Sequence, residues 1–283
     1  MSVDYRLNRL LSPDGKCCEV ALDHGVHNEA SFLPGIENLA QVVDCLAAAG
    51  ADALLLSMGH ARLLQKHLGR QKPSLIVRAD PTSFYGTPAP AAPFCNLLEH
   101  AVERAVALDA TAVVANLMWT PRNPELHREC VANIGKLKPE CERLGMPLVV
   151  EPLLWLHDDK SGAFKFNPGL KRYGALVRQA VELGADVVKA DPSENLAEYA
   201  QVIETASGTP VLLRGGSRIS DKELLVRTHE LMRLGAAGVV YGRNIYQHAH
   251  PERMLAACNA IVHKNASVAE AEAILTGDSA STL

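Results

Sequence analysis

The chain has 283 residues, a formal net charge of −4 at pH 7, and 48% hydrophobic against 21% charged residues. This length is normal for one α/β barrel, and the hydrophobic share is enough to bury a large core. The absence of a long basic run argues against a nucleic-acid partner, and no uninterrupted apolar stretch reaches about 18 residues, so no membrane span is expected.

Short apolar runs alternate along the chain with longer amphipathic segments. The apolar runs, predicted as strands, are 18–23, 53–56, 75–78, 111–117, 148–151, 186–189, 211–214 and 238–241. The amphipathic segments, predicted as helices, are 36–49, 57–68 (with Ser57 as N-cap), 97–108, 124–144, 168–183, 196–205, 221–234 and 252–264. Two long irregular segments, 80–93 and 155–167, follow the third and fifth strands, and loops of such length in a compact domain are usually functional or disordered.

Eight strand–helix units predict a parallel sheet with right-handed crossovers, closed into a single (β/α)8 TIM barrel over residues 1–266. Three helices end in similar turns, at Gly50, Gly184 and Gly235, which lead into the next strand. An open, doubly wound sheet is the alternative, but no GxGxxG motif follows the first strand. Residues 267–283 are predicted to form a flexible C-terminal tail.

The seven cysteines are scattered and include no CxxC motif, and the N-terminus lacks the features of a secretory signal peptide. Reduced thiols in a cytoplasmic protein are the expectation that follows.

In a barrel, the chemistry is located at the C-terminal ends of the strands. The polar residues predicted there are Asp23, Ser57, Asp80, Asn116, Glu151, Lys189, Arg214 and Arg243. Lys189 ends an apolar run, so its amine is expected to point toward the barrel axis. Burial disfavours the ammonium form, and a neutral lysine amine is a nucleophile toward carbonyls. The position of Lys189 alone supports a second interpretation equally well, in which Lys189 pairs with Glu151 or Asp191 and only stabilises the fold.

Glycine turns follow the seventh and eighth strands. Arg214 precedes Gly215 and Gly216, and Gly242 precedes Arg243. Glycines allow backbone N–H groups to approach an anion, and phosphate sites recur at this place in the fold. These five residues are therefore the predicted phosphate-binding group.

Asp23 and Glu151 are the candidates for proton transfer, with simple charge balance for Lys189 and Arg214 as the alternative. Tyr85 lies in the long third loop and is better interpreted as an exposed residue than as an acid or base. His24 and His27 are close to Asp23, but a hydrogen-bonding or surface role is favoured over metal ligation because no third ligand is evident.

Four segments resemble the class I aldolases of the archaeal-type fructose-bisphosphate aldolase group, which is related to tagatose-bisphosphate aldolase, sulfofructose-phosphate aldolase and autoinducer-2 phosphate thiolase. The segments are 21–25 (ALDHG), 187–189 (VVK), 213–216 (LRGG) and 241–248 (YGRNIYQH). The resemblance covers about residues 15–272. It implies a Schiff base on Lys189, a polar or catalytic role for Asp23, phosphate binding at Gly215, Gly216, Gly242 and Arg243, and a homo-oligomer.

Two positions depart from the pattern of that group. Residues 151–154 read EPLL where the fructose-bisphosphate enzymes carry an aromatic pair that includes an acid–base tyrosine, and Arg214 replaces a small residue. The glutamate resembles the tagatose-bisphosphate and sulfosugar branch. Proton transfer is therefore expected from Glu151, together with Asp23, and the identity of the sugar is left open.

The expected function is a class I aldolase that cleaves or forms a phosphorylated ketose from dihydroxyacetone phosphate (DHAP) and an aldehyde, with no metal and no organic cofactor. A Schiff-base enzyme of acyl transfer or transaldol chemistry is the second hypothesis. A non-catalytic sugar-phosphate sensor and a metal-dependent class II aldolase are weaker, because a buried lysine gives a sensor no advantage and no histidine triad is evident.

Overall fold

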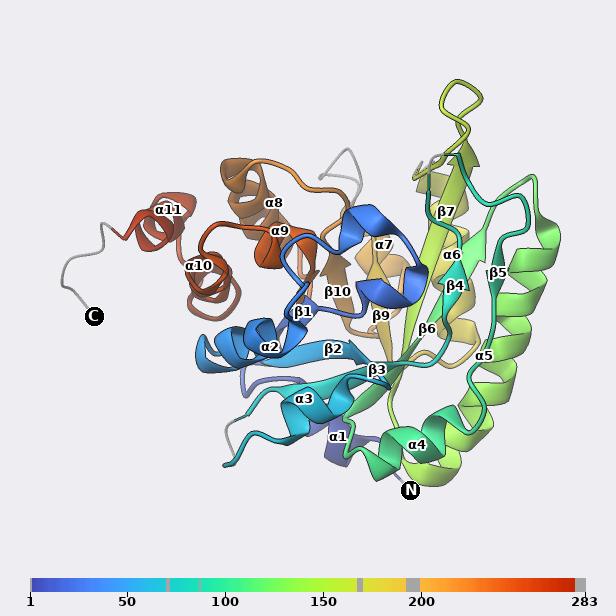
Figure 1. Cartoon of the computed structure of the whole chain (residues 1–283), viewed down its shortest axis with the longest axis horizontal. Helices are drawn as coiled ribbons and strands as arrows, with labels where there is room; N and C mark the ends of the chain where they lie inside the picture. Colours follow the sequence, from blue (N-terminus) through green and yellow to red (C-terminus); the bar gives the residue numbers. More distant parts are fainter. Residues whose placement is uncertain (1, 70–71, 87, 167–169, 192–198, 278–283) are drawn as a thin grey trace.

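The structure is a computed structural model that describes residues 2–69, 72–86, 88–166, 170–191 and 199–277. Eight parallel strands form a closed ring in chain order (Figure 1). They are β1 (Cys17–Ala21), β2 (Ala53–Ser57), β3 (Ser74–Arg78), β6 (Ala112–Trp119), β7 (Leu148–His157), β9 (Val187–Ala190), β10 (Val211–Arg214) and β11 (Gly238–Tyr241). Because β11 pairs with β1 and β6 pairs with β7, the sheet is closed. The predicted barrel is confirmed, and the open sheet is excluded.

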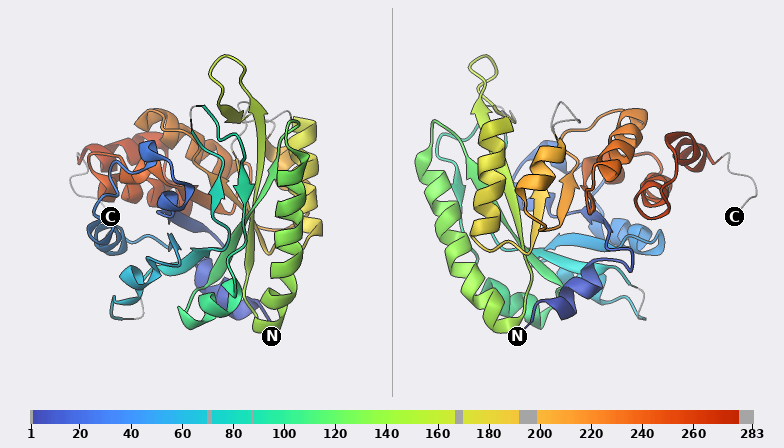
Figure 2. Two further views of the ribbon diagram at one scale, coloured as in Figure 1. Left: turned by 45° about the vertical axis from the view of Figure 1, so that its right-hand side comes forward. Right: turned by 180° about the vertical axis from the view of Figure 1, so that it is seen from behind.

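A helix follows each barrel strand and packs on the outside of the ring (Figures 1 and 2). These helices are α2 (Leu39–Ala48), α3 (Ala61–Gln65), α4 (Ala101–Ala107), α5 (Pro124–Leu144), α6 (Leu170–Glu182), α7 (Tyr199–Thr205), α8 (Asp221–Arg233) and α10 (Pro251–Lys264). The bounds of α5 match the prediction, and Gly145 ends it in the left-handed conformation. The predicted starts of α6 and α7, at 168–169 and 196–198, lie outside the described residues.

Side chains alternate along each strand between the barrel axis and the helices. In β1, Cys18 and Val20 belong to the apolar layer beneath the helices, whereas Cys17 and Ala21 belong to a second layer on the axis. This second layer fills the lower barrel with small and branched side chains. The same alternation directs the residue at the end of several strands into the upper barrel.

A helix that was not predicted, α1 (Asp4–Leu10), lies at the N-terminal end of the barrel. Its Leu10 is buried in the layer on the barrel axis. Arg6 Nη1 donates to the carbonyl oxygens of Leu144 and Gly145, at 3.2 and 2.8 Å. The helix therefore covers the end of the barrel opposite the catalytic face that the fold predicts.

The long third and fifth loops contain strands. In the third, β4 (Thr82–Ser83) pairs antiparallel with β5 (Phe94–Cys95). In the fifth, β7 continues through His157 and pairs with β8 (Phe164–Phe166), which gives a hairpin that projects from the barrel (Figure 1). The apolar and aromatic residues of this extension favour a strand, which explains why the fifth strand is longer than predicted.

The prediction that Ser57 caps a helix is wrong. Ser57 ends β2, opposite Arg78 of β3, and α3 begins only after His60. Pairing with β3 extends the strand through Ser57, so the helix starts four residues later and His60 occupies its N-cap position.

Residues 267–283 were predicted as a flexible tail, but part of the segment forms α11 (Val268–Thr276), which packs against α10 and α8. Ser267 and Glu270 form a reciprocal capping box, and Ala271 is buried. The capping box and the burial of Ala271 favour a packed helix over a flexible tail at residues 268–276. In the described part of the chain, none of the helices combines the length and the apolar character that crossing a bilayer demands.

Candidate active site

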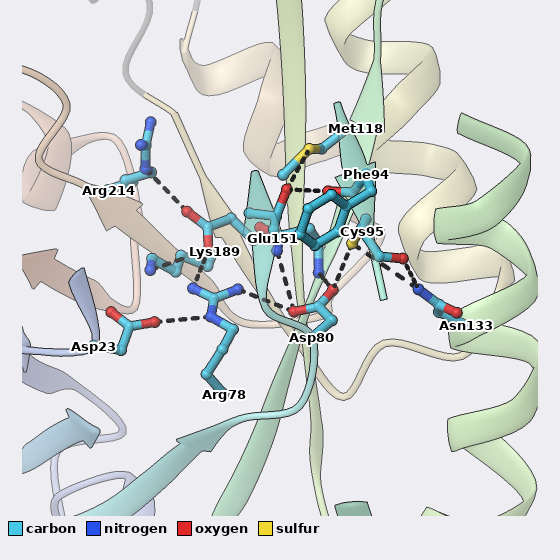
Figure 3. A network of polar contacts seen from close by, with 12 residues as sticks. Asp23, Arg78, Asp80, Phe94, Cys95, Met118, Asn133, Glu151, Lys189 and Arg214 are labelled. Carbon is cyan, nitrogen blue, oxygen red and sulfur yellow. Dashed lines mark hydrogen bonds and ion pairs between the residues drawn. The ribbon is translucent and has the colours of Figure 1, made fainter. Parts of the chain in front are cut away.

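Lys189 and Glu151 lie side by side inside the upper barrel. Their strands are neighbours, with Val149 opposite Val187, so the residues two positions further along, Glu151 and Lys189, also face the axis. Both side chains are almost fully buried, and Lys189 Nζ lies 3.2 Å from Glu151 Oε2 (Figure 3). The predicted nucleophile and the predicted proton acceptor therefore form an ion pair.

Arg78, at the end of β3, joins the carboxylates from two other strands. Its Nε donates to Asp23 Oδ2 and its Nη2 to Glu151 Oε2, both at 2.8 Å (Figure 3). The guanidinium is buried, with only 2% of the side chain exposed. Sequence reasoning missed this residue, although the apolar run 75–77 followed by a cation is the same signal that identified Lys189.

Arg214 contacts two carboxylates and a phenol. Its Nε lies 2.9 Å from Glu151 Oε1, its Nη1 donates to Asp191 Oδ1 at 2.5 Å, and its Nη2 donates to the Tyr85 hydroxyl at 3.2 Å. This predicted phosphate-binding residue is thus held by acidic partners. Tyr85, which was expected to be exposed, is half-buried and lines the site.

The surrounding cations keep two buried carboxylates ionised. Burial alone would raise the pKa of Glu151, but Lys189, Arg78 and Arg214 outweigh burial and hold that pKa well below its usual range. The same holds for Asp23. Burial raises its pKa, but the opposing influence of Arg78 and Lys189 is larger, and the pKa is held well below its usual range. Both groups are therefore carboxylates at neutral pH and accept protons rather than donate them.

Glu19 is a buried acid of the opposite character. It lies on β1 between Cys17 and Ala21 and has 2% of its surface exposed. Its Oε2 has no hydrogen-bond partner among the described residues. Burial raises its pKa to about 8, against the lowering influence of Lys189. At neutral pH Glu19 is therefore an uncharged acid inside the barrel, and sequence reasoning did not identify it.

A cavity opens above the buried ion pairs, and its empty volume is about 460 Å³ when the space at its open mouth is included. It is lined by Ala21, Asp23, His24, His27, Phe32, Arg78, Tyr85, Glu151, Lys189, Arg214, Gly215, Gly216, Val240, Gly242 and Arg243. The structure thus brings all eight of the predicted site residues to one cavity. Of the other polar strand ends, Asp80 instead accepts hydrogen bonds from the backbone and side chain of Asn116, at 2.6 and 3.1 Å, and its Oδ1 lies 3.5 Å from Arg78 Nη1.

The glycine turns leave room for neighbouring groups. A Cβ atom on Gly242 would lie 2.5 Å from His24 Cε1 and 3.2 Å from the carbonyl oxygen of Ala21, so only glycine fits there. Gly216 has a φ of +67°, and its carbonyl oxygen accepts a hydrogen bond from Arg243 Nη2 at 3.1 Å. These contacts fix the turn that was predicted to hold a phosphate.

His24 and His27 lie inside the cavity wall rather than on the surface. Burial lowers the pKa of His24 to about 3 and that of His27 to about 4, so both imidazoles are neutral. His24 Nδ1 lies 4.0 Å from Asp23 Oδ1. In the described ranges, no group of three or more His, Cys, Asp or Glu side chains is arranged to hold a metal ion.

Comparisons with known proteins show the family of the chain. A family model described as DeoC/LacD family aldolase matches residues 17–248. An uncharacterized aldolase of Saccharolobus solfataricus is 31% identical over 92% of this chain and 94% of its own, and a 2-amino-3,7-dideoxy-D-threo-hept-6-ulosonate synthase of Halobacterium salinarum is 29% identical over 92% and 91%.

Solved structures share the fold. The crystal structure of an archaeal fructose 1,6-bisphosphate aldolase superposes with a TM-score of 0.75 at 22% identity, and covers 93% of this chain and 100% of its own. A Schiff-base-forming fructose-1,6-bisphosphate aldolase gives the same TM-score and coverage at 23% identity.

Proposed function

The chain belongs to the DeoC/LacD aldolase family and is an aldolase, and we propose that it works through a Schiff base on Lys189 with a phosphorylated ketose as its substrate. The observation that carries this proposal is the 3.2 Å ion pair between Lys189 and Glu151 inside the barrel mouth. A buried amine beside a proton acceptor, below an open cavity, meets the requirements of imine formation.

In the cleavage direction, Lys189 Nζ attacks the ketone carbon of the substrate, and loss of water gives an iminium. Glu151, with Asp23 close by, takes the proton from the C4 hydroxyl. The C3–C4 bond breaks, its electron pair moves into the iminium, and the aldehyde leaves. Protonation of the resulting enamine and hydrolysis of the imine then release DHAP and the free lysine.

The ion pair also couples two proton transfers. Lys189 is the cation that most lowers the pKa of Glu151. When the ammonium gives up its proton in forming the neutral carbinolamine, that influence disappears and the carboxylate becomes a stronger base. Glu151 is therefore suited to accept the proton of Lys189 and to pass it to the carbinolamine hydroxyl, which leaves as water. Once ionised again, it can take the proton of the substrate C4 hydroxyl.

We assign the substrate phosphate to the turns after β10 and β11, at Gly215, Gly216, Gly242 and Arg243. The contact that excludes a side chain at Gly242 and the positive φ at Gly216 support this assignment. Arg214 borders the same cavity, but with Glu151, Asp191 and Tyr85 as partners it serves mainly to balance the charge of the carboxylates.

A transaldol-type reaction is the second candidate. It is favoured by the relatives of Halobacterium salinarum and Archaeoglobus fulgidus, which are both named as hept-6-ulosonate synthases. The same lysine and carboxylate would serve this chemistry, because only the acceptor of the enamine differs.

The test is a cleavage assay on a panel of phosphorylated ketoses, including sulfonated ones, with DHAP release as the readout. We expect one of them to be cleaved, with activity lost in Lys189→Met and retained in Lys264→Met, a lysine at the far end of α10. Retention of activity in Lys189→Met, or its loss on treatment with EDTA, would contradict the proposal.

We also propose that the enzyme is a cytoplasmic homo-oligomer. All seven cysteines are free thiols and six of them are buried, which supports a reducing compartment. Light scattering on the purified protein would test the oligomeric state.

A further inference from the structure

A second chamber adjoins the Lys189 cavity and shares five lining residues with it. The shared residues are Phe32, Tyr85, Arg214, Gly216 and Arg243. The chamber has an empty volume of about 1860 Å³ including its open mouth. A substrate joined to Lys189 therefore extends into it, and this second chamber is the place for the aldehyde half.

Aromatic rings form one wall of the chamber. Aromatic residues make up only 5% of the chain, yet Phe32, Phe84, Tyr85, Trp155 and Phe164 all line this space. Phe84 and Phe164 are stacked at 4.3 Å, and Tyr85 contacts Phe32 edge-on at 4.9 Å. Phe84 and Tyr85 come from the third loop, and Trp155 and Phe164 come from the β7–β8 hairpin. These are the two long segments that were predicted to be functional or disordered. Such a wall favours a flat, apolar ligand body.

Four cations and two acids line the chamber, so cationic side chains are in excess there. Arg227, on α8, makes no ion pair or hydrogen bond with any described residue, although its charge lowers the pKa of Glu223, four residues earlier. Arg243 donates to the carbonyl oxygen of Gly216 and lies over the Phe32 ring at 4.8 Å, without a carboxylate partner among the described residues. Since Arg243 belongs to the proposed phosphate site, Arg227 remains for a second anionic group.

We propose that the aldehyde partner of this enzyme has an aromatic body and carries a carboxylate remote from its carbonyl group, with the ring against Phe164 and the carboxylate at Arg227. The inference rests on the proposed Schiff-base function. In the synthetic direction, the enamine of DHAP forms a bond to the aldehyde carbon, the aldehyde oxygen takes up a proton, and water frees the product from Lys189. The water that is lost when the Schiff base forms is taken up again at hydrolysis, so the product contains the atoms of both reactants. No redox partner is required.

The experiment compares three acceptors with DHAP as the donor: 4-carboxybenzaldehyde, benzaldehyde and glyceraldehyde 3-phosphate. We expect kcat/KM for 4-carboxybenzaldehyde to exceed that for glyceraldehyde 3-phosphate by about tenfold or more. Phe164→Ala should lower kcat/KM for both aromatic aldehydes by about tenfold. Arg227→Gln should lower it by about tenfold for the carboxylated aldehyde only.

Phe94→Ala is the matched control, because Phe94 is exposed and lines neither cavity. Preference for glyceraldehyde 3-phosphate, or equal effects of Phe164→Ala and Phe94→Ala, would overturn the inference. Borohydride trapping of DHAP is run on the same proteins. A trapped adduct at Lys189 together with the wrong acceptor preference overturns this inference alone, whereas the absence of any adduct at Lys189 overturns the proposed function as well.

Discussion

Glu151 Oε2 lies within 3.2 Å of Lys189 Nζ and also accepts a hydrogen bond from Arg78 at 2.8 Å. One carboxylate thus serves the proposed nucleophile and a buried arginine that reaches across the barrel. Its other oxygen lies 2.9 Å from Arg214 Nε. The negative charge of Glu151 therefore balances three cations. Its removal should lower both the catalytic rate and the free energy of unfolding.

Replacing Glu151 by Gln should lower kcat by about 10²- to 10⁴-fold, because the amide cannot accept the proton of the substrate hydroxyl. Rapid-mixing kinetics of C–C cleavage would measure the loss. Glu204→Gln, at an exposed position of α7, is the control and should retain full activity. Equal activity of the two variants would remove Glu151 from the mechanism.

Replacing Arg78 by Met should reduce the free energy of unfolding by about 3 kcal/mol, because it leaves the Asp23 and Glu151 carboxylates buried with fewer cationic partners. The acid limb of the kcat/KM profile should also move to higher pH, since the carboxylates become easier to protonate. Urea unfolding and a pH profile would measure the two effects. Arg78→Lys keeps the charge but cannot form both hydrogen bonds, so an intermediate result is expected. A stable variant with an unchanged pH profile would refute this role.

Glu19→Gln should stabilise the protein at high pH. Burial raises the pKa of Glu19 from 4.5 to about 8, so in the folded state the acid is neutral at a pH where the unfolded chain is ionised. Unfolding then releases a proton, and stability decreases as pH rises from about 4.5 to about 8. Since one pKa unit corresponds to about 1.4 kcal/mol, the full penalty is roughly 5 kcal/mol, and Gln avoids it.

Thermal unfolding of the wild type and the Glu19→Gln variant at pH 4 and pH 9 would check this. The gain in stability should be present at pH 9 and absent at pH 4. Glu151 acts with the opposite sign: its pKa is depressed, so the stability that it contributes is present above its usual pKa of 4.5 and is lost as pH falls. A gain of the same size at both pH values would mean that Glu19 does not titrate as described.

Gly242→Ala should raise KM for phosphorylated substrates by about tenfold or more, because the new methyl group would lie 2.5 Å from His24 Cε1 and would displace either the turn or the imidazole. Steady-state kinetics would show it. Gly135→Ala, in the middle of α5 with no atom within 4 Å of its new Cβ, is the control and should leave KM unchanged.

Much of the fold was predictable, because strand–helix alternation and glycine turns are local signals. All eight barrel strands were predicted with starts within one residue of the observed ones, whereas β7 continues beyond its predicted end. Predictions failed where a long-range contact decides the structure. Ser57 is kept in β2 by its pairing with Arg78, and the tail residues form α11 because Ala271 is buried against neighbouring helices.

The site was predictable where a residue ends an apolar strand, as Lys189, Glu151 and Arg214 do. Arg78 shows the same signal, but it was not predicted as a site residue because Asp80, two residues later, is also a polar residue at the end of that strand. Tyr85 and Glu19 could not be placed in the same way. The position of Tyr85 depends on how its loop folds over the barrel, and the buried state of Glu19 depends on the closure of the ring, which brings β1 beside β11.

Borohydride reduction of the enzyme in the presence of DHAP, followed by digestion and peptide mass mapping, tests most directly whether Lys189 forms the Schiff base. We expect a reduced DHAP adduct on the peptide that contains Lys189, and no adduct in the Lys189→Met variant. An adduct on a different lysine, or the absence of an adduct from an enzyme that cleaves a phosphorylated ketose, would contradict it.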